Sequence, residues 1–195
     1  MNWRRLTALV VLVAVMGLCT IALAEEEGSI LRRTVYVKYT EPRLLATMKH
    51  KGPYEEIPAV VDKVMAEVVK GNHLLAGPVM VLYFNSPQNV PASDLEWEVG
   101  IPVVVPGAIS KSEFDKVGFN VMESIYVAYK YHVGPYEKVG DTYATLFDWI
   151  EKNKYPLSGF PIEVYWSDPK TTPQEKLVTE VWLPITERET PGIKR

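Results

Sequence analysis

A glutamate between two apolar residues near the C-terminus is the first candidate for chemistry. Glu180 lies in LVTEVWLP, where strand alternation puts Val178 and Trp182 on its own face. Burial among apolar groups and rings disfavours a charged carboxylate unless a cation compensates it. A flat organic cation offers both charge pairing and contact with ring faces. The pattern therefore predicts a site for an apolar, cationic small molecule, with Glu180 as its anchor.

Further aromatic and acidic side chains are predicted on the same face. In PIEVYWSDP we interpret Ile162, Val164 and Trp166 as facing a helix, which leaves Glu163 and Tyr165 on the other side. In SIYVAYKYHVG a small alanine suits close approach of a helix, so the tyrosines beside it point away. The predicted ligand-binding residues are Glu180, Trp182, Tyr129, Tyr131, Tyr165, Glu163 and, as either a second anchor or a rim residue, Glu98.

These side chains lie in a structural unit that the sequence repeats. HKGPYE begins at His50 and HVGPYE at His132, and 132 − 50 = 82. The same offset, without a gap, pairs Tyr83 with Tyr165 and many other positions. Two copies, each longer than the units of a solenoid, predict two similar halves about a pseudo-twofold axis, with a binding cleft on that axis.

Each copy has the pattern strand, helix, strand, strand. Gly52 and Pro53 suit a sharp turn from strand into helix. Apolar residues then recur at helical spacing from Ile57 to Val68, and Gly71 ends the helix. VMVLYF and LEWEVGIPV, like IEVYW and LVTEVWLP in the second copy, are strand-like. Two helices and six strands predict an α+β fold with a mainly antiparallel sheet around a central cleft.

The duplicated unit resembles the GyrI-like small-molecule-binding domain, also called the bacterial effector-binding domain, from about Val35 to Ile185. HxGPYE before each helix, a Y…DP turn and a final E-x-x-x-P strand carry the resemblance. It implies a fold related to that of SOUL proteins, and a pocket in which the last-strand glutamate, Glu180, meets hydrophobic, often cationic ligands. It also implies a protein that binds or sequesters such a ligand. The chain has no helix-turn-helix region, so the family's role in transcription is not carried over.

The resemblance leaves two alternatives open. Some stand-alone family members hydrolyse strained cyclopropane compounds, and here Glu180 would be the base for a water, with Tyr131 and Tyr165 as candidate acids. The SOUL relationship allows noncovalent binding of haem or another tetrapyrrole. The binding protein is the preferred hypothesis and an enzyme the alternative.

No cofactor or metal site is predicted. The sequence has no HExxH or CxxCH motif, and its one cysteine, Cys19, lies in the apolar N-terminal segment. His50 and His132 precede the two Gly-Pro turns, and we interpret them as structural hydrogen-bonding partners.

The N-terminus is typical of an export signal. MNWRR precedes an apolar run from Leu6 to Ala24 that ends in Ala-Leu-Ala, which predicts cleavage before Glu25 and a periplasmic or extracellular protein. An uncleaved membrane anchor is the alternative. The predicted organisation is a signal peptide at 1–24, a tail at 25–34, one domain at 35–185 with repeats at about 35–105 and 117–185, and a tail at 186–195.

The charge pattern restricts the class of partner. The formal net charge is −3, and no stripe of lysine and arginine appears. Nucleic-acid binding needs clustered positive charge to neutralise phosphates. The predicted partner is therefore a small molecule and not a nucleic acid, with contact to a membrane only if the N-terminal segment stays uncleaved.

Overall fold

The computed structural model describes residues 34–109 and 117–187. The predicted signal peptide and most of the predicted C-terminal tail lie outside these ranges. Contacts divide the chain into Met1–Thr34 and Val35–Arg195, and all the helices and strands described belong to the second unit. In the described part, no helix is long and apolar enough to cross a membrane.

The repeated unit of strand, helix, strand, strand is confirmed in both halves. The first repeat contains β2 (Arg43–Lys51), α2 (Ile57–Lys70), β4 (Val79–Tyr83) and β5 (Glu96–Val104). The second contains β7 (Tyr126–Val133), α4 (Val139–Asn153), β8 (Ile162–Tyr165) and β9 (Val178–Pro184). Short 3-10 turns η2 (Ala92–Asp94) and η4 (Gln174–Lys176) precede the last strand of each repeat.

The Gly-Pro dipeptide makes the turn that starts each helix. Gly52 and Gly134 have φ angles of 154° and 134°, a region that residues with a Cβ rarely adopt. The prolines that follow are extended N-caps of two 3-10 turns, η1 (Tyr54–Glu56) and η3 (Tyr136–Lys138), which lead into α2 and α4. Each turn therefore places a tyrosine where the first strand gives way to the helix.

The strands form an antiparallel sheet in the order β1-β7-β9-β8-β4-β5-β2-β6, and β3 (Leu74–Leu75) pairs with β5. β1 (Tyr36–Tyr39) and β6 (Gly118–Met122) are additions to the six predicted strands, as is β3. β1 and β6 are themselves repeat mates, because 118 − 36 = 82. β1 nevertheless pairs with β7 of the second repeat, and β6 with β2 of the first. The first strand of each half thus completes the sheet of the other half.

The sheet order is the same from either end, so a pseudo-twofold axis passes between β4 and β8. Along this pair of strands Val81 lies opposite Glu163, and the two are repeat mates, because 163 − 81 = 82. The axis therefore runs between Val81 and Glu163. The predicted duplication is confirmed, and a carboxylate lies where its halves meet.

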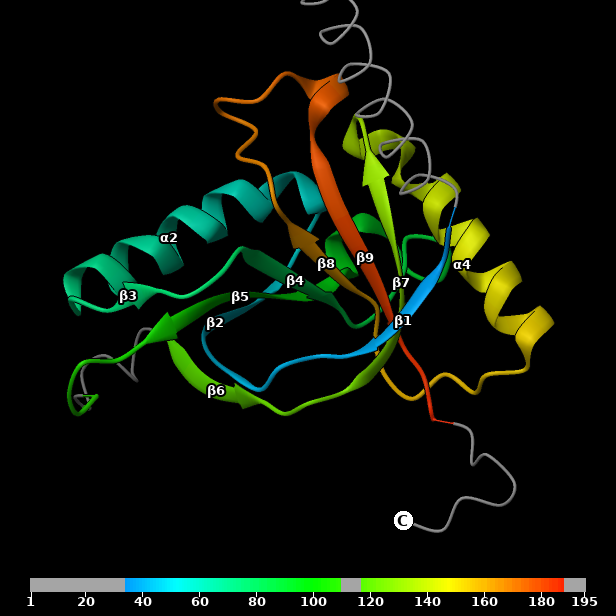
Figure 1. Ribbon diagram of the computed structural model, residues 1–195. Helices are drawn as coiled ribbons and strands as arrows, with labels where there is room; N and C mark the ends of the chain where they lie inside the picture. The colour runs from blue at the N-terminus through cyan, green and yellow to red at the C-terminus, as the bar shows by residue number, and fades with distance from the viewer. Residues whose placement is uncertain (1–33, 110–116, 188–195) are drawn as a thin grey trace, which may run out of the picture. The chain divides into compact units, whose positions relative to one another are not determined.

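Both helices lie on one face of the sheet, α2 against the first repeat and α4 against the second (Figure 1). Ala46 and Val81 are buried in the core under α2, while Ala128 and Val181 are buried under α4. The two alanines confirm the expectation that a small residue admits a helix. The opposite face of the sheet has its own apolar cluster, built on Leu45, Met80, Val127, Ile162, Val164 and Trp182. The α+β class with an antiparallel sheet is therefore confirmed.

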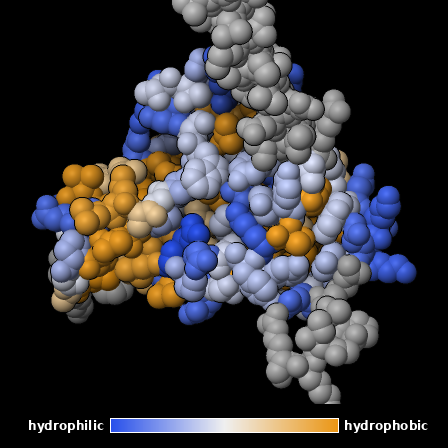
Figure 2. Space-filling view, in the orientation of Figure 1, coloured by the Kyte–Doolittle hydropathy of each residue, from blue (hydrophilic) through white to orange (hydrophobic). Residues whose placement is uncertain are grey.

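Apolar side chains also gather on the surface at the end of the sheet where β3, β5 and β6 lie (Figure 2). The exposed residues there include Leu74, Leu75, Val104 and Val121. The aromatic strands β7 and β9 lie toward the other end of the strand order. The apolar patch and the predicted binding residues are therefore separate features of the domain.

Candidate ligand-binding site

Strand β8 carries candidate side chains on both faces of the sheet. Its Glu163 lies between Val81 and Val181, which both pack under the helices. The prediction that Glu163 and Tyr165 lie on the face away from the helices is therefore wrong. Ile162, Val164 and Trp166 were predicted to face a helix, and this is also wrong, because they lie on the face of Glu180. Both faces of β8 are largely buried, so apolar alternation does not identify the helix-facing side.

Glu163 is bound by three tyrosine hydroxyls. Tyr143 of α4 donates to Oε1 at 2.9 Å, while Tyr165 and Tyr83 donate to Oε2 at 2.7 and 3.2 Å. The hydroxyl oxygens of Tyr83 and Tyr165 are 2.7 Å apart. Glu163 is only 6% exposed. Because Tyr83 and Tyr165 are repeat mates, this network closes across the pseudo-twofold axis.

The tyrosines of the two HxGPYE motifs, Tyr54 and Tyr136, pack against the tyrosines that surround Glu163. The ring of Tyr54 meets that of Tyr83 edge-on at 5.1 Å, and the ring of Tyr136 meets that of Tyr165 in the same way at 5.5 Å. Tyr54 and Tyr136 are both half-buried. The repeated motif therefore supplies two ring pairs related by the axis. We call the group of Glu163, Tyr83, Tyr143, Tyr165, Tyr54 and Tyr136 the tyrosine cage.

The electrostatics of the tyrosine cage follow from its burial. Loss of solvent raises the pKa of Glu163, and the three hydroxyl donors and the charge of His132 offset this rise only in part. Burial, together with the nearby carboxylate, also raises the pKa values of Tyr83, Tyr143 and Tyr165 well above 10. The hydroxyls therefore stay protonated and act as donors. The cage holds a desolvated carboxylate whose named hydrogen-bonding partners are neutral.

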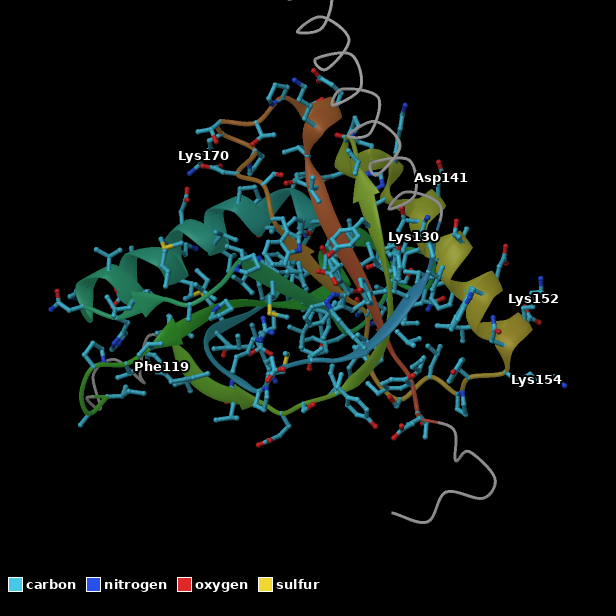
Figure 3. The ribbon with its side chains drawn as sticks, in the orientation of Figure 1. Phe119, Lys130, Asp141, Lys152, Lys154 and Lys170 are labelled. Carbon is cyan, nitrogen blue, oxygen red and sulfur yellow. The ribbon has the colours of Figure 1, made fainter. Side chains whose placement is uncertain are left out.

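The loop between β8 and β9 connects the second repeat to the helix of the first. Figure 3 shows Lys170 on this loop near α2, where its ammonium donates to Asp62 Oδ1 at 2.9 Å. Asp168 of the same loop is close enough to Tyr136 to help raise the pKa of that hydroxyl, after burial and the charge of Glu163. An exposed ion pair contributes little stability. It marks the contact between this loop and α2.

Glu180 lies on the face away from the helices, as predicted, together with three of the predicted aromatic residues. The register pairs Tyr131 with Glu180 and Tyr129 with Trp182. Glu180 is fully buried at 0% exposure. Its carboxylate forms an ion pair with Lys38 of β1 and accepts a hydrogen bond from Trp166 Nε1 at 3.0 Å. The cation expected to come from a ligand is thus already supplied by the chain.

Glu98 occupies the corresponding place in the first repeat, with a different environment. It is 9% exposed and lies between Lys49 and Leu82 in the sheet. Gly100 takes the place of Trp182, and a Cβ built there would lie 3.1 Å from Leu45 Cδ1. The glycine therefore allows close packing by Leu45, and rings like those around Glu180 are absent from these register positions.

The catalytic set of the hydrolase alternative is not assembled as predicted. Tyr131 and Glu180 share one face of the sheet, whereas Tyr165 lies on the other and donates to Glu163. The histidines have structural partners, as expected: His132 Nε2 donates to the carbonyl of Pro135 at 2.9 Å, and His50 Nε2 lies 2.5 Å from Glu56 Oε2. Within residues 34–109 and 117–187, no group of three or more acidic, histidine or cysteine side chains could hold a metal ion.

Comparison with known proteins identifies the family of the domain. The model of the GyrI-like small molecule binding domain matches residues 20–104 and 119–186. The chain belongs to the GyrI-like family. No curated protein matches the sequence significantly.

Solved structures share the GyrI-like fold at low sequence identity. The crystal structure of the EcmrR C-terminal domain has 19% identity and a TM-score of 0.69, over 80% of this chain and 98% of that one. EcmrR in a cryo-EM complex with DNA has 17% identity and a TM-score of 0.70, over 95% and 71%. A hydrolase from Listeria innocua has 16% identity and a TM-score of 0.60, over 84% and 97%. These likenesses show the fold.

Sequence reasoning missed several residues of this GyrI-like domain. Tyr83 and Tyr143 belong to the tyrosine cage and Lys38 to the Glu180 site, but none was selected. For Tyr83 the sequence carries a signal, because this tyrosine repeats as Tyr165 at the offset of 82. Tyr143 has Val61 as its mate and Lys38 has Asn120, so the repeat gave no signal for either.

Proposed function

We propose that this protein binds an apolar aromatic cation in the tyrosine cage, with Glu163 as the counter-charge, and that it does so outside the cytoplasm. Membership of the GyrI-like family supports the binding of a small molecule. The character of the cage supports the class of ligand, and the N-terminal sequence supports export.

The environment of Glu163 is the observation that carries the proposal. A carboxylate that is 6% exposed and bonded to three neutral hydroxyls has lost most of its hydration without gaining an ion pair among these contacts. Such a group gains more from an incoming cation than a solvated carboxylate does, because folding has already removed most of its hydration. The aromatic rings around it add cation-π attraction.

Glu180 is the weaker choice of anchor, although the sequence favoured it. Lys38 compensates its charge and Trp166 bonds its second oxygen. A cationic ligand at Glu180 would have to break this ion pair before gaining its own. The three tyrosine hydroxyls that bond to Glu163 carry no positive charge, so a cationic ligand displaces no ion pair with them and gains more there.

Titration with a matched pair of ligands tests the proposal. Methyltriphenylphosphonium carries the charge and three rings, while triphenylphosphine oxide has a similar shape without the charge. We expect Glu163→Gln to weaken binding of the cation by about 1.5 to 3 kcal/mol, the scale of a charge-assisted contact, and to change binding of the oxide far less. Isothermal titration calorimetry measures both.

Glu98→Gln is the matched control, because it removes a largely buried glutamate from the other face of the same sheet. We expect this variant to bind the cation like the wild type. Equal affinity of wild type and Glu163→Gln for the phosphonium would rule out Glu163 as the anchor. A loss confined to Glu180→Gln would move the anchor to that residue.

The proposed location is tested separately by N-terminal sequencing of protein recovered from its host. A mature chain that begins at Glu25 and fractionates outside the cytoplasm is expected. Recovery of a chain that still contains Leu6 to Ala24 from the membrane fraction would contradict cleavage and support the alternative of an uncleaved membrane anchor.

The cage also favours a second candidate function, hydrolysis of a strained ligand. The Tyr165 hydroxyl and the Glu163 carboxylate are 2.7 Å apart, so a tyrosine and a glutamate of the kind required by that alternative are in hydrogen-bonding contact here. Mass analysis of a cyclopropane-bearing ligand after incubation distinguishes the two functions. A gain in mass by one water in wild type, absent in Glu163→Gln, would establish the hydrolase.

A further inference from the structure

Exposed apolar side chains gather at one end of the sheet (Figure 2). We call this surface the apolar patch, and it comprises Leu74 and Leu75 of β3, Val104 of β5 and Val121 of β6. No charged residue occurs at positions 74–83, at positions 99–109 or in β6. Exposed apolar side chains that gather in one place mark an interaction surface.

The fold itself does not require the patch to be apolar, because the other end of the sheet has polar residues at equivalent positions. At the repeat offset of 82, Val104 corresponds to Thr186, Val105 to Glu187, and Val121 to Tyr39. The Tyr39 hydroxyl donates a hydrogen bond to Glu187, so a polar pair lies where the first repeat has two valines. The same scaffold therefore tolerates polar side chains there.

Strand β6 adds an open sheet edge to the patch. It is the last strand in the order and pairs with β2, so its other edge has no strand beside it within residues 34–109 and 117–187. Its five residues include neither a charge nor a proline, the features with which natural proteins protect an open edge. The opposite terminal strand, β1, carries Lys38 and the Tyr39 hydroxyl that bonds to Glu187. β6 is therefore the edge better suited to accept another strand.

The absence of charge from the patch indicates which partner it suits. In a twofold contact the same surface lies on both sides, so residues near the axis meet their own copies. A charge there would meet a like charge, and two chains with a formal net charge of −3 already repel each other. An uncharged patch avoids that cost. A surface for anionic lipids is instead rich in lysine and arginine, and the patch has neither.

We propose that this protein forms a twofold dimer in which β6 pairs antiparallel with β6 of a second copy, and that the apolar patch is buried between the two chains. Two antiparallel strands are related by a twofold axis, so this pairing continues the sheet from one copy into the other. Both copies use the same surface, which closes the assembly at two chains. The dimer does not depend on ligand binding at Glu163.

Sedimentation velocity over a series of concentrations tests the dimer, with protein recovered from its host. We expect the wild type to pass from monomer to dimer as its concentration rises. Leu75→Asp should raise the dissociation constant at least about tenfold, because it places a charge in the patch of both copies. It should bind methyltriphenylphosphonium like the wild type, which separates this result from failure of the proposed function.

Leu157→Asp is the matched control. Leu157 is the repeat mate of Leu75, and the two are 50% and 56% exposed. Leu157 pairs with Ile185 as Leu75 pairs with Val103, so the same substitution is made in the same local structure. This variant should dimerise like the wild type. A wild type that is monomeric at every concentration, or equal losses in the two variants, would overturn the inference.

A charge exchange at Val121 tests the twofold pairing of β6 and does not rely on Leu75. Val121→Asp and Val121→Lys should each be monomeric at concentrations where the wild type is a dimer, because like charges meet across the axis. Val121 is exposed, so both variants should keep the fold, as checked by circular dichroism. An equal mixture of the two should dimerise again. A mixture that stays monomeric would refute the pairing of β6 with itself.

Flotation with vesicles of phosphatidylethanolamine and phosphatidylglycerol tests lipid as the rival partner. We expect wild type and Leu75→Asp to float to the same extent, because any contact through the N-terminal segment is the same in both. Flotation of a monomeric wild type that Leu75→Asp abolishes would overturn the dimer and assign the patch to a membrane surface.

Discussion

The surroundings of Glu180 and of its repeat mate Glu98 differ at nearly every position, although the backbone around them is the same. Glu180 has rings beside it and an ion pair with Lys38. In the first repeat Trp182 is replaced by Gly100, and Lys38 is replaced by Asn120, which donates from Nδ2 to the Thr47 hydroxyl at 2.9 Å. Thr47 itself stands where the second repeat has Tyr129.

The features that the two repeats share belong instead to the scaffold. Both have the Gly-Pro turn, a buried alanine under the helix, and a tyrosine at the start of that helix. Both copies must pack a helix on the same kind of strand, so these residues serve the same purpose twice. On the face away from the helices neither repeat packs a helix, so the two repeats are not required to keep the same residues there. Residues that are the same in both repeats therefore belong to the structural framework, whereas the surroundings of the buried carboxylates Glu163 and Glu180 differ between the repeats.

The clearest departure lies on the axis, where Val81 faces Glu163. Val81→Glu would place a second carboxylate opposite the first at a position with 0% exposure. We expect this change to have the largest effect, a loss of about 4 kcal/mol or more in the free energy of unfolding. Urea denaturation measures it.

The control for this change exchanges the two residues. Val81→Glu/Glu163→Val moves the carboxylate to the mate position, within the symmetry-related reach of Tyr83 and Tyr165. Most of the loss should be recovered, apart from the bond to Tyr143, whose mate is Val61. No recovery would show that the pseudo-symmetry does not extend to the cage.

Removal of the Lys38 charge comes next in size. Lys38→Met leaves the buried Glu180 without a cation, and we expect a loss of about 2 to 3 kcal/mol in unfolding free energy. The mate change Asn120→Ala removes one neutral hydrogen bond and should cost about 1 kcal/mol. Equal losses in the two variants, measured in urea, would show that the ion pair contributes no more than the amide.

The two axis-related tyrosines allow a finer comparison. Tyr165 donates to Glu163 at 2.7 Å and Tyr83 at 3.2 Å. Tyr165→Phe should therefore destabilise the domain by about 1 to 2 kcal/mol, and Tyr83→Phe by about 0.5 to 1 kcal/mol. Thermal and urea unfolding of the two variants compare them. The reverse order would mean that Tyr83 is the stronger donor.

The smallest effect is a dependence on pH. The pKa of Glu163 is raised in the folded protein, chiefly by burial, so the folded state holds this proton more tightly than the unfolded chain. Stability from this group is therefore fully present below the ordinary glutamate pKa of 4.5 and is lost as pH rises through the raised value. Glu163→Gln should abolish that part of the stability profile. Glu98→Gln should leave it unchanged, and identical profiles for wild type and Glu163→Gln would contradict the assignment.

Much of the fold could be predicted from the sequence because its signals are local or repeated. The Gly-Pro turns, the helical spacing from Ile57 to Val68 and the unit of strand, helix, strand, strand are all present as predicted. The strand exchange was not predictable, because β1 is only four residues long and nothing local shows that it pairs with the opposite repeat.

The candidate site was predicted in part. Glu180, Trp182, Tyr129 and Tyr131 share a face as predicted, because Val178 and Trp182 mark that face in a strand with clear alternation. Glu163 and Tyr165 were assigned to the wrong face, because β8 is covered on both sides and its apolar residues indicate neither. Their roles in binding remain predictions.

The sequence by itself determined that the chain is a duplication, which unit is duplicated, and that carboxylates lie among aromatic side chains in its strands. A strand or helix period is read from neighbouring residues, and a repeat offset is read by comparing the chain with itself. Both can therefore be recognised in the sequence alone. Only the tertiary structure decided that the axis passes between Val81 and Glu163 and that Lys38 neutralises Glu180 from 142 residues away. These facts depend on which strands pair and in what register, and that choice follows from the burial of the whole sheet, which no single segment contains.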